Sequence, residues 1–282
     1  MELISQLDLD DIIRRALAED VGQGDITTAA TVPAGNRGRA RIVIKEPEMI
    51  LAGGMLFERV FAMTGAAPRV AQLAAEGARL RKGDVLAEID GMLAGLLIGE
   101  RVALNFVQLL SGIATITRRF VDAVAGTRAR IVDTRKTHPG LRALEKYAVR
   151  AGGGHNHRFG LDSGILIKEN HIAAAGSVTA AIEGARRIAP HGFRVEIECE
   201  TLAQVEEARR AGAGAMLLDN MARADVTQAR KIAGDDTILE VSGGVSLETV
   251  RAIAETGVDI ISVGALTHSA RAVDISMRIE GA

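Results

Sequence analysis

The chain has 282 residues, 48% of them apolar and 25% charged, so it is long enough to bury a core in one large domain or two smaller ones. Its 34 Lys and Arg nearly balance its 36 Asp and Glu, which leaves no general positive field to attract nucleic acid or an anionic membrane. The lone Cys199 excludes an internal disulfide and a cysteine-based zinc site. The acidic start of the sequence fits neither a secretory signal nor a transit peptide, so we expect a cytoplasmic protein.

The first part of the chain mixes helices and strands. Its expected elements are, in order, a helix over residues 9–18, a strand over 39–45, a helix over 55–63, and strands over 78–80 and 85–89 joined in a hairpin by the turn at 82–84. The apolar stretch that follows, residues 92–117, is interrupted by four polar residues and so predicts a buried helix rather than a membrane span. We therefore expect a small N-terminal α+β domain over residues 1–112.

Short apolar runs then alternate with amphipathic helices, a pattern typical of strand and helix units around a parallel sheet. The runs are residues 130–132, 165–167, 195–198, 215–218, 238–241 and 260–263, and the helices are 141–151, 178–188, 202–211, 223–233 and 247–256. The last three runs recur about every 22 residues, which favours a (β/α) barrel, although a doubly wound open sheet fits the same period. We expect this α/β-barrel domain over residues 113–282, with the C-terminal tail packing back on the N-terminal domain.

Polar residues or glycines follow every one of these runs, where a parallel sheet places its functional mouth. Three bases at these run ends, with two more from the loop at 152–158, would suit a ligand with several negative groups, and surface salt bridges are the alternative role. They are Arg135, Lys136, His157, Arg158 and Lys168. The low aromatic content, 2%, argues against a stacking surface for single-stranded nucleic acid, so the expected ligand is a small anion.

Glycines at the last two strand ends supply a second feature of the mouth. Ser242, Gly243 and Gly244 precede a helix that we expect near Ser246, and Gly264 follows the next strand. Backbone N–H groups there could bind a phosphate, although a tight turn that needs positive φ would explain the glycine pair equally well.

Two acids, Glu198 and Asp219, end neighbouring strands. They could hold a Mg²⁺ that bridges pyrophosphate, accept hydrogen bonds from ribose or stabilise a positive centre, or they could merely neutralise the bases. A metal hydrolase built on His155 and His157 is disfavoured, because these histidines follow three glycines instead of ending an apolar strand.

In order and in context, these residues resemble the quinolinate phosphoribosyltransferase family, also called nicotinate-nucleotide pyrophosphorylase (carboxylating). The matching stretches are residues 19–28, 100–105, 133–147, 152–158, 166–171, 196–198, 217–220, 240–244 and 262–274, which together span nearly the whole chain. The run from Asp133 to Arg142 is highly specific, whereas the glycine pairs alone would not be. His138 departs from the apolar residue that the family often has at that position.

The resemblance implies an incomplete (β/α) barrel with a smaller N-terminal α+β domain, in a homodimer with interface active sites. It implies that quinolinate and phosphoribosyl pyrophosphate react, with Mg²⁺ as cofactor, to give nicotinate mononucleotide, pyrophosphate and carbon dioxide in NAD biosynthesis. Its expected catalytic residues are Lys136, Lys168, Glu198 and Asp219, the last two facing Mg²⁺. Its expected substrate-binding residues are Arg101 of the partner subunit together with Arg135, His157, Arg158, Ser242, Gly243, Gly244 and Gly264.

Two other functions fit parts of this pattern. An aldolase-like lyase would use Lys168 as a Schiff-base nucleophile, which requires a desolvated amine free of neighbouring acids. A sugar-phosphate-binding regulator would keep the barrel and its anion site but turn nothing over.

Overall fold

The computed structural model describes residues 6–280, which divide into two compact units. Unit 1 takes its residues from 1–118, 137–153 and 266–282, and unit 2 takes residues 119–136 and 154–265. Unit 1 is therefore formed from three stretches of the sequence, among them the C-terminal residues that we expect to pack back on the N-terminal domain.

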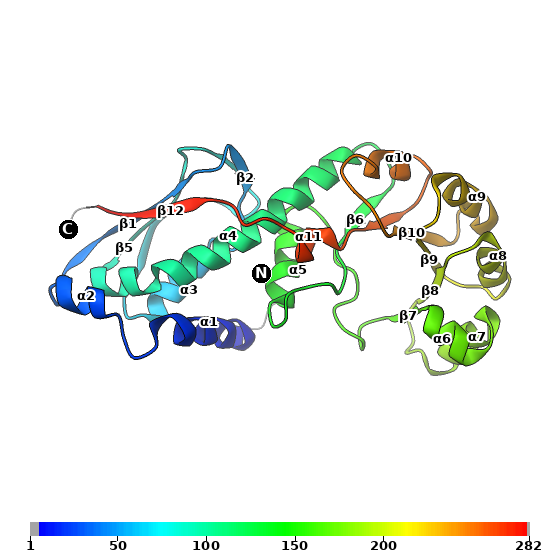
Figure 1. The fold of residues 1–282 in the computed structure, drawn as a ribbon, viewed down its shortest axis with the longest axis horizontal. Helices are drawn as coiled ribbons and strands as arrows, with labels where there is room; N and C mark the ends of the chain where they lie inside the picture. The colour runs from blue at the N-terminus through cyan, green and yellow to red at the C-terminus, as the bar shows by residue number, and fades with distance from the viewer. Residues whose placement is uncertain (1–5, 281–282) are drawn as a thin grey trace. The chain divides into compact units, whose positions relative to one another are not determined.

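Unit 1 contains an antiparallel sheet in the order β12-β1-β5-β3 and a separate two-stranded sheet of β2 and β4. The strands are β1 (Arg37–Ile44), β2 (Glu48–Ile50), β3 (Arg69–Leu73), β4 (Arg79–Arg81), β5 (Val85–Met92) and β12 (Ile275–Glu280). The C-terminal strand β12 lies beside β1, with Ile44 opposite Ile275 (Figure 1). The expected hairpin between residues 78–80 and 85–89 is wrong, because β4 pairs with β2 while β5 pairs with β1 and β3.

The helices of unit 1 pack around the long helix α4. They are α1 (Gln6–Val21), α2 (Ile26–Thr31), α3 (Leu56–Met63), α4 (Leu93–Ala123), whose last turn enters unit 2, and α5 (Arg142–Ala151). By length and composition α4 could cross a membrane, but more than half of its most apolar window is buried, as in the core helix of a soluble protein. On α3, Phe57 and Phe61 are fully buried with ring centroids 6.1 Å apart.

Unit 2 is built on a six-stranded parallel sheet in the order β6-β11-β10-β9-β8-β7. The strands are β6 (Arg130–Val132), β7 (Ile165–Ile167), β8 (Val195–Cys199), β9 (Ala215–Asp219), β10 (Ile238–Ser242) and β11 (Ile260–Ser262). Strands β7 to β11 lie side by side in chain order, without the reversal of a doubly wound sheet. Among the described residues β6 and β7 form the two edges, so the expected incomplete barrel is confirmed.

Helices cover the outside of this sheet (Figure 1). They are α6 (Glu169–Ala175), α7 (Val178–Ile188), α8 (Leu202–Arg210), α9 (Arg223–Ala233) and α10 (Val250–Ala254). The short α11 (Ala265–His268) follows β11, and its residues from Leu266 onward belong to unit 1. The helix expected near Ser246 begins only at Val250, because residues 246–249 form a turn in which Thr249 Oγ1 accepts the Ser246 N–H at 3.0 Å. Helix α6 was not expected, since its first turn coincides with the polar stretch after β7.

Candidate anion-binding site

An ion pair joins two of the expected catalytic side chains at the carboxyl ends of neighbouring strands. Lys168 follows β7 and its Nζ lies 2.5 Å from Oε2 of Glu198 on β8. Glu198 is 7% exposed, while the Lys168 side chain reaches solvent. The Lys168 backbone N–H donates to His171 Nδ1 at 2.9 Å, which fixes the start of α6 and the base of the Lys168 side chain. A lysine held this way is a charged donor to an anion rather than a neutral nucleophile.

The next two strand ends are locked together around Asn220. Asp219 ends β9 opposite Ser242 of β10, and Asn220 donates its backbone N–H to the Ser242 carbonyl at 3.0 Å. Asn220 has φ of 53°, a left-handed conformation that is uncommon outside glycine and is enriched at functional sites. Its side-chain Nδ2 donates to Asp219 Oδ2 at 2.8 Å, so one oxygen of Asp219 is oriented by the chain itself.

Glycine is required at position 243 by both conformation and space. Gly243 has φ of 90°, and a Cβ added there would overlap Oδ1 of Asn220. Gly244 also has positive φ, 60°, with nothing crowding its Cβ position. The tight-turn explanation of the glycine pair is therefore correct, and it leaves phosphate binding as an additional role that the turn permits.

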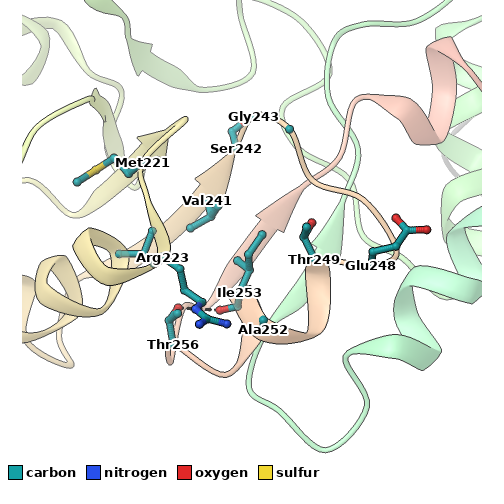
Figure 2. A pocket seen from close by; sticks show the side chains of 12 residues that line it. Met221, Arg223, Val241, Ser242, Gly243, Glu248, Thr249, Ala252, Ile253 and Thr256 are labelled. Carbon is teal, nitrogen blue, oxygen red and sulfur yellow. Dashed lines mark hydrogen bonds between the residues drawn. The ribbon is translucent and has the colours of Figure 1, made fainter.

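A cavity of about 460 Å³ opens beside this glycine turn. Ser242, Gly243 and Gly244 line it together with residues of α9 and α10, including Arg223 and Thr249 (Figure 2). Since α10 has only five residues, the turn at 242–244 and not a helix N-terminus is the part of this cavity that we consider for phosphate binding.

The loop that carries His157 and Arg158 is anchored by a buried carboxylate. Asp133, fully buried after β6, accepts the Asn156 side-chain N–H at 2.6 Å and the His157 backbone N–H at 2.9 Å. Val132 also forms an isolated parallel bridge with His155. The specific run that begins at Asp133 therefore holds residues 155–157 against the end of β6.

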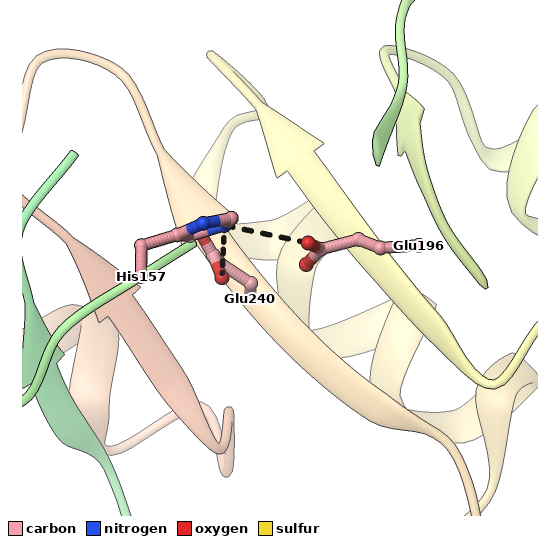
Figure 3. Close-up of side chains that lie close together, drawn as sticks. All are labelled: His157, Glu196 and Glu240. Carbon is pink, nitrogen blue, oxygen red and sulfur yellow. Dashed lines mark ion pairs between the residues drawn. The ribbon is translucent and has the colours of Figure 1, made fainter. Parts of the chain in front are cut away.

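His157 does not face the mouth with a free ring nitrogen. Its Nε2 lies 3.3 Å from Glu196 Oε2 and 3.6 Å from Glu240 Oε2 (Figure 3). Its Nδ1 accepts the backbone N–H of Arg158 at 2.7 Å. The two carboxylates are inward-facing residues of β8 and β10, and Glu240 is 1% exposed. Burial, and then the neighbouring Glu196 carboxylate, raise the pKa of Glu240 to about 8.

This cluster lies beside a second cavity, of about 230 Å³, at the amino-terminal ends of the strands. The first residues of four strands line it, namely Ile165, Ala215, Ile238 and Ile260, together with Arg194, which precedes β8. His157, Arg158, Glu196 and Glu240 line the same cavity. His157, Glu196 and Glu240 thus place titratable side chains inside the barrel, a feature that the sequence did not predict.

Two arginines of unit 2 influence each other electrostatically. The Arg158 guanidinium is partly buried and donates through Nη1 to the Gly164 carbonyl at 3.0 Å. Burial, and then the nearby positive charge of half-buried Arg135, lower the pKa of Arg158, while Glu196 raises it. Two like charges held together in a partly dry site are stabilised by an anion between them.

The remaining predicted site residues are less constrained. Lys136 is exposed, with its backbone N–H bound to Thr134 Oγ1 at 3.0 Å, and Gly264 follows β11 at the same sheet end as Asp133. Arg101 lies on an exposed face of α4 in unit 1. The binding and catalytic roles given to these residues stay predictions.

Sequence reasoning missed Glu196, Glu240 and the anchoring role of Asp133. A signal existed for Glu196, because it precedes Glu198 by two residues and so faces the same side of β8. Among the described residues, His157, Glu196 and Glu240 are also the one group of three that could hold a metal ion. The hydrogen bond from Arg158 N–H to Nδ1 opposes that role, since a neutral imidazole then carries its proton on Nε2, the atom that would have to bind the metal.

The fold and these residues define an α/β-barrel protein with charged side chains inside the barrel and at the carboxyl ends of its strands, and comparison with known proteins identifies the family. The model "Quinolinate phosphoribosyl transferase, N-terminal domain" matches residues 25–111, and the corresponding C-terminal domain model matches residues 113–278. The chain therefore belongs to the quinolinate phosphoribosyltransferase family.

Individual relatives match over nearly their whole length. The nicotinate-nucleotide pyrophosphorylase [carboxylating] of Mycobacterium leprae is 47% identical over 95% of this chain and 95% of its own, and a probable one of Bacillus subtilis is 43% identical over 98% and 95%. The solved structure of NadC from Streptococcus pyogenes has a TM-score of 0.93 at 42% identity, covering 98% of this chain and 97% of that chain. The nicotinate-nucleotide pyrophosphorylase of Francisella tularensis gives 0.92 at 36% identity, with 98% of both chains covered.

Proposed function

We propose that the protein transfers the phosphoribosyl group of phosphoribosyl pyrophosphate to quinolinate and releases carbon dioxide, forming nicotinate mononucleotide and pyrophosphate for NAD biosynthesis. The observation that carries the proposal is the partly buried Arg158 guanidinium, which lies 3.0 Å from the Gly164 carbonyl and within the electrostatic reach of Arg135. Quinolinate has two adjacent carboxylates, and each planar guanidinium can bind one of them through two parallel hydrogen bonds. Family membership and the names of the relatives support the same reaction.

The chemistry needs positioning more than a covalent nucleophile. The quinolinate ring nitrogen is a weak nucleophile, and pyrophosphate must leave from a ribose carbon that gains positive charge. Holding the two substrates in line, and placing cations such as Lys136 and Lys168 beside the leaving group, would lower this barrier. Glu198 and Asp219 would face the ribose, and residues 242–244 with Gly264 would bind the 5′-phosphate.

Mg²⁺ is part of the proposal because the donor set fits it. Glu198 and Asp219 each keep one carboxylate oxygen outside the contacts that Lys168 and Asn220 make. Mg²⁺ usually takes one or two protein carboxylates and completes its shell with water and substrate phosphate. When bound, it would neutralise charge on the pyrophosphate.

The assembly and location are also proposals. We propose a homodimer in which Arg101 of the partner subunit completes each site, which is supported by the exposure of Arg101 on α4 and by the family resemblance. A cytoplasmic location is supported by the single, buried Cys199. Small-molecule substrates, not nucleic acid or membrane, are the proposed partners.

The test is an assay of purified protein with quinolinate, phosphoribosyl pyrophosphate and Mg²⁺. We expect quinolinate-dependent release of carbon dioxide and pyrophosphate, and loss of activity when the metal is chelated and recovery when Mg²⁺ is restored. Consumption of nicotinate without quinolinate-dependent release would contradict the substrate assignment. A lyase that used Lys168 as a Schiff base is disfavoured by its 2.5 Å ion pair with buried Glu198, and borohydride trapping with a sugar phosphate would detect one.

A further inference from the structure

The side chain of His157 is held from both ends of its ring, and the two contacts specify one tautomer. A backbone N–H can only donate, so the 2.7 Å contact with Arg158 N–H requires an unprotonated Nδ1 that accepts. The ring proton is then on Nε2. That atom faces carboxylate oxygens of Glu196 and Glu240, at 3.3 and 3.6 Å, so its proton points between two acceptors. Each contact favours the tautomer that the other requires.

The two carboxylates that face Nε2 of His157 are held in fixed positions by the sheet. Glu196 and Glu240 project from the interior of β8 and β10, where strand pairing on both sides fixes the backbone. The Glu240 side chain is 2% exposed and that of Glu196 14% exposed, so neither has free rotation into water. Burying two carboxylic acids beside one histidine costs free energy unless each acid is hydrogen-bonded or paired. Neither Glu196 nor Glu240 has a role in the substrate chemistry proposed above.

The contact on the other side of the ring connects this cluster to the anion site. By accepting the Arg158 N–H, Nδ1 of His157 fixes the backbone from which the Arg158 side chain departs. The far end of that side chain is fixed by the Gly164 carbonyl, at 3.0 Å from Nη1. With both ends held, the Arg158 side chain has one defined position in the lining of the cavity.

We infer that Glu196 and Glu240 are positioning residues for anion binding: by holding His157 as the Nε2–H tautomer, they orient the Nδ1 atom that fixes the backbone of Arg158, whose guanidinium binds the anion. The inference deepens the proposed function, on which it rests, and concerns the quinolinate side of the reaction. A metal at the same cluster is the competing explanation. It would need the Nε2 lone pair, which this tautomer does not offer.

The first measurement is the tautomer itself. In protein labelled with ¹⁵N-histidine, two-dimensional NMR that correlates the ring nitrogens with the ring protons identifies which nitrogen carries the proton, and His157→Gln assigns the signal among the six histidines. We expect one protonated nitrogen, Nε2, in the wild-type protein at neutral pH. An Nδ1–H or doubly protonated ring would overturn the inference, as would a shift of the His157 signals by added Zn²⁺ with one ion bound per chain. This measurement needs no turnover, so it stands even if the quinolinate assay fails.

The second measurement compares steady-state kinetics of Glu196 variants. Glu196→Leu removes the acceptor of the Nε2 proton, and we expect it to raise KM for quinolinate about tenfold while KM for phosphoribosyl pyrophosphate and kcat stay within about threefold. Glu196→Gln keeps an acceptor oxygen, so it should have a KM for quinolinate close to the wild-type value and keep the wild-type tautomer. Equal effects of the Leu and Gln variants on KM, with the tautomer unchanged in both, would overturn the inference.

Controls separate positioning from folding. The matched control is Glu206→Leu on α8, whose carboxylate is exposed and lies 4.0 Å from Arg210, and it should leave all constants unchanged. If Glu196→Leu does not fold, Glu240→Leu, which removes the other acceptor of the Nε2 proton, replaces it and should show the same selective rise in KM for quinolinate, with a smaller magnitude. A rise in both substrate KM values would indicate a general loss of site structure and would count against the inference.

Discussion

Arg135 is the residue whose replacement should affect substrate binding most directly. Arg135→Ala would remove a planar donor that can bind a carboxylate through two hydrogen bonds, and we expect kcat/KM for quinolinate to fall on the order of 10²-fold. The measurement is steady-state kinetics at saturating phosphoribosyl pyrophosphate. Arg210→Ala, which truncates an exposed arginine on α8, is the control and should behave as wild type. Unchanged kinetics in the Arg135 variant would reject its assigned role.

Glu240 should make stability depend on pH. Its pKa is raised, first by burial and then by Glu196, to about 8, whereas an unfolded Glu titrates near 4.3. The folded state therefore binds more protons than the unfolded state within that window, and the free energy of unfolding should fall as pH rises from about 4.3 to 8, by up to about 1.4 kcal/mol per pH unit. Its contribution is complete below this window and lost above it.

Replacing Glu240 isolates this contribution. Glu240→Gln has no proton to lose, so urea unfolding at a series of pH values should give a flatter profile for the variant than for the wild type across the same window. Parallel profiles would mean that Glu240 does not take up a proton on folding.

The residues at strand ends could be predicted from the sequence, whereas the polar interior could not. A polar residue after an apolar run marks the strand end, and the topology of parallel sheets then brings Lys168 and Glu198 together. Glu240 sits within an apolar run, where a single acid indicates neither a ligand nor a partner. Its partners Glu196 and His157 are far away in sequence, so only the folded barrel brings the three together.

At the scale of the elements, helix α4 packs closely against the backbone of residues 271–272. Gly112 lies in the middle of α4, and a Cβ there would overlap the Arg271 carbonyl oxygen and crowd Ala272. We expect Gly112→Ala to lower the free energy of unfolding by roughly 1–3 kcal/mol because the backbone of both segments must move. Chemical denaturation followed by circular dichroism measures the change.

Gly184 on α7 provides the matched comparison for this element. A Cβ at Gly184 would meet its nearest atom, Arg187 Nη2, at 3.7 Å, an ordinary contact. Gly184→Ala should therefore be neutral or stabilise the protein by about 0.5–1 kcal/mol through helix propensity. If neither variant changes the free energy of unfolding, α4 can shift without cost and its close approach to residues 271–272 does not contribute to stability.

Strand positions were predictable where helices separate them and not where strands follow one another. The six runs of unit 2 match β6 to β11 within one or two residues, because the helices between them mark where each strand begins and ends. In unit 1 the turn at 82–84 correctly separated two strands but falsely indicated that they pair. The choice of partner was decided by long-range contacts, as in the pairing of β1 with β12.

At the scale of the whole molecule, the proposed dimer predicts complementation. Arg101→Ala and Arg135→Ala place their defects on opposite sides of the proposed interface, so a hybrid dimer would contain one intact site and one site with both defects. Co-expressed chains with two different tags, purified over both, should recover about half of the wild-type activity. Each variant purified alone is the control. Hybrids as inactive as their parents would mean that Arg101 acts within its own subunit or not at all.

The pairing of β12 with β1 has a consequence for how the chain is made. The ribosome synthesises β1 early in translation, whereas its partner β12 is synthesised only after all of unit 2. Until then β1 presents an unsatisfied strand edge, a known template for misassembly. Barrel strands can pair during synthesis, whereas the N-terminal sheet must wait for termination, so premature stop codons before residue 275 would leave a folded barrel attached to an aggregation-prone remnant.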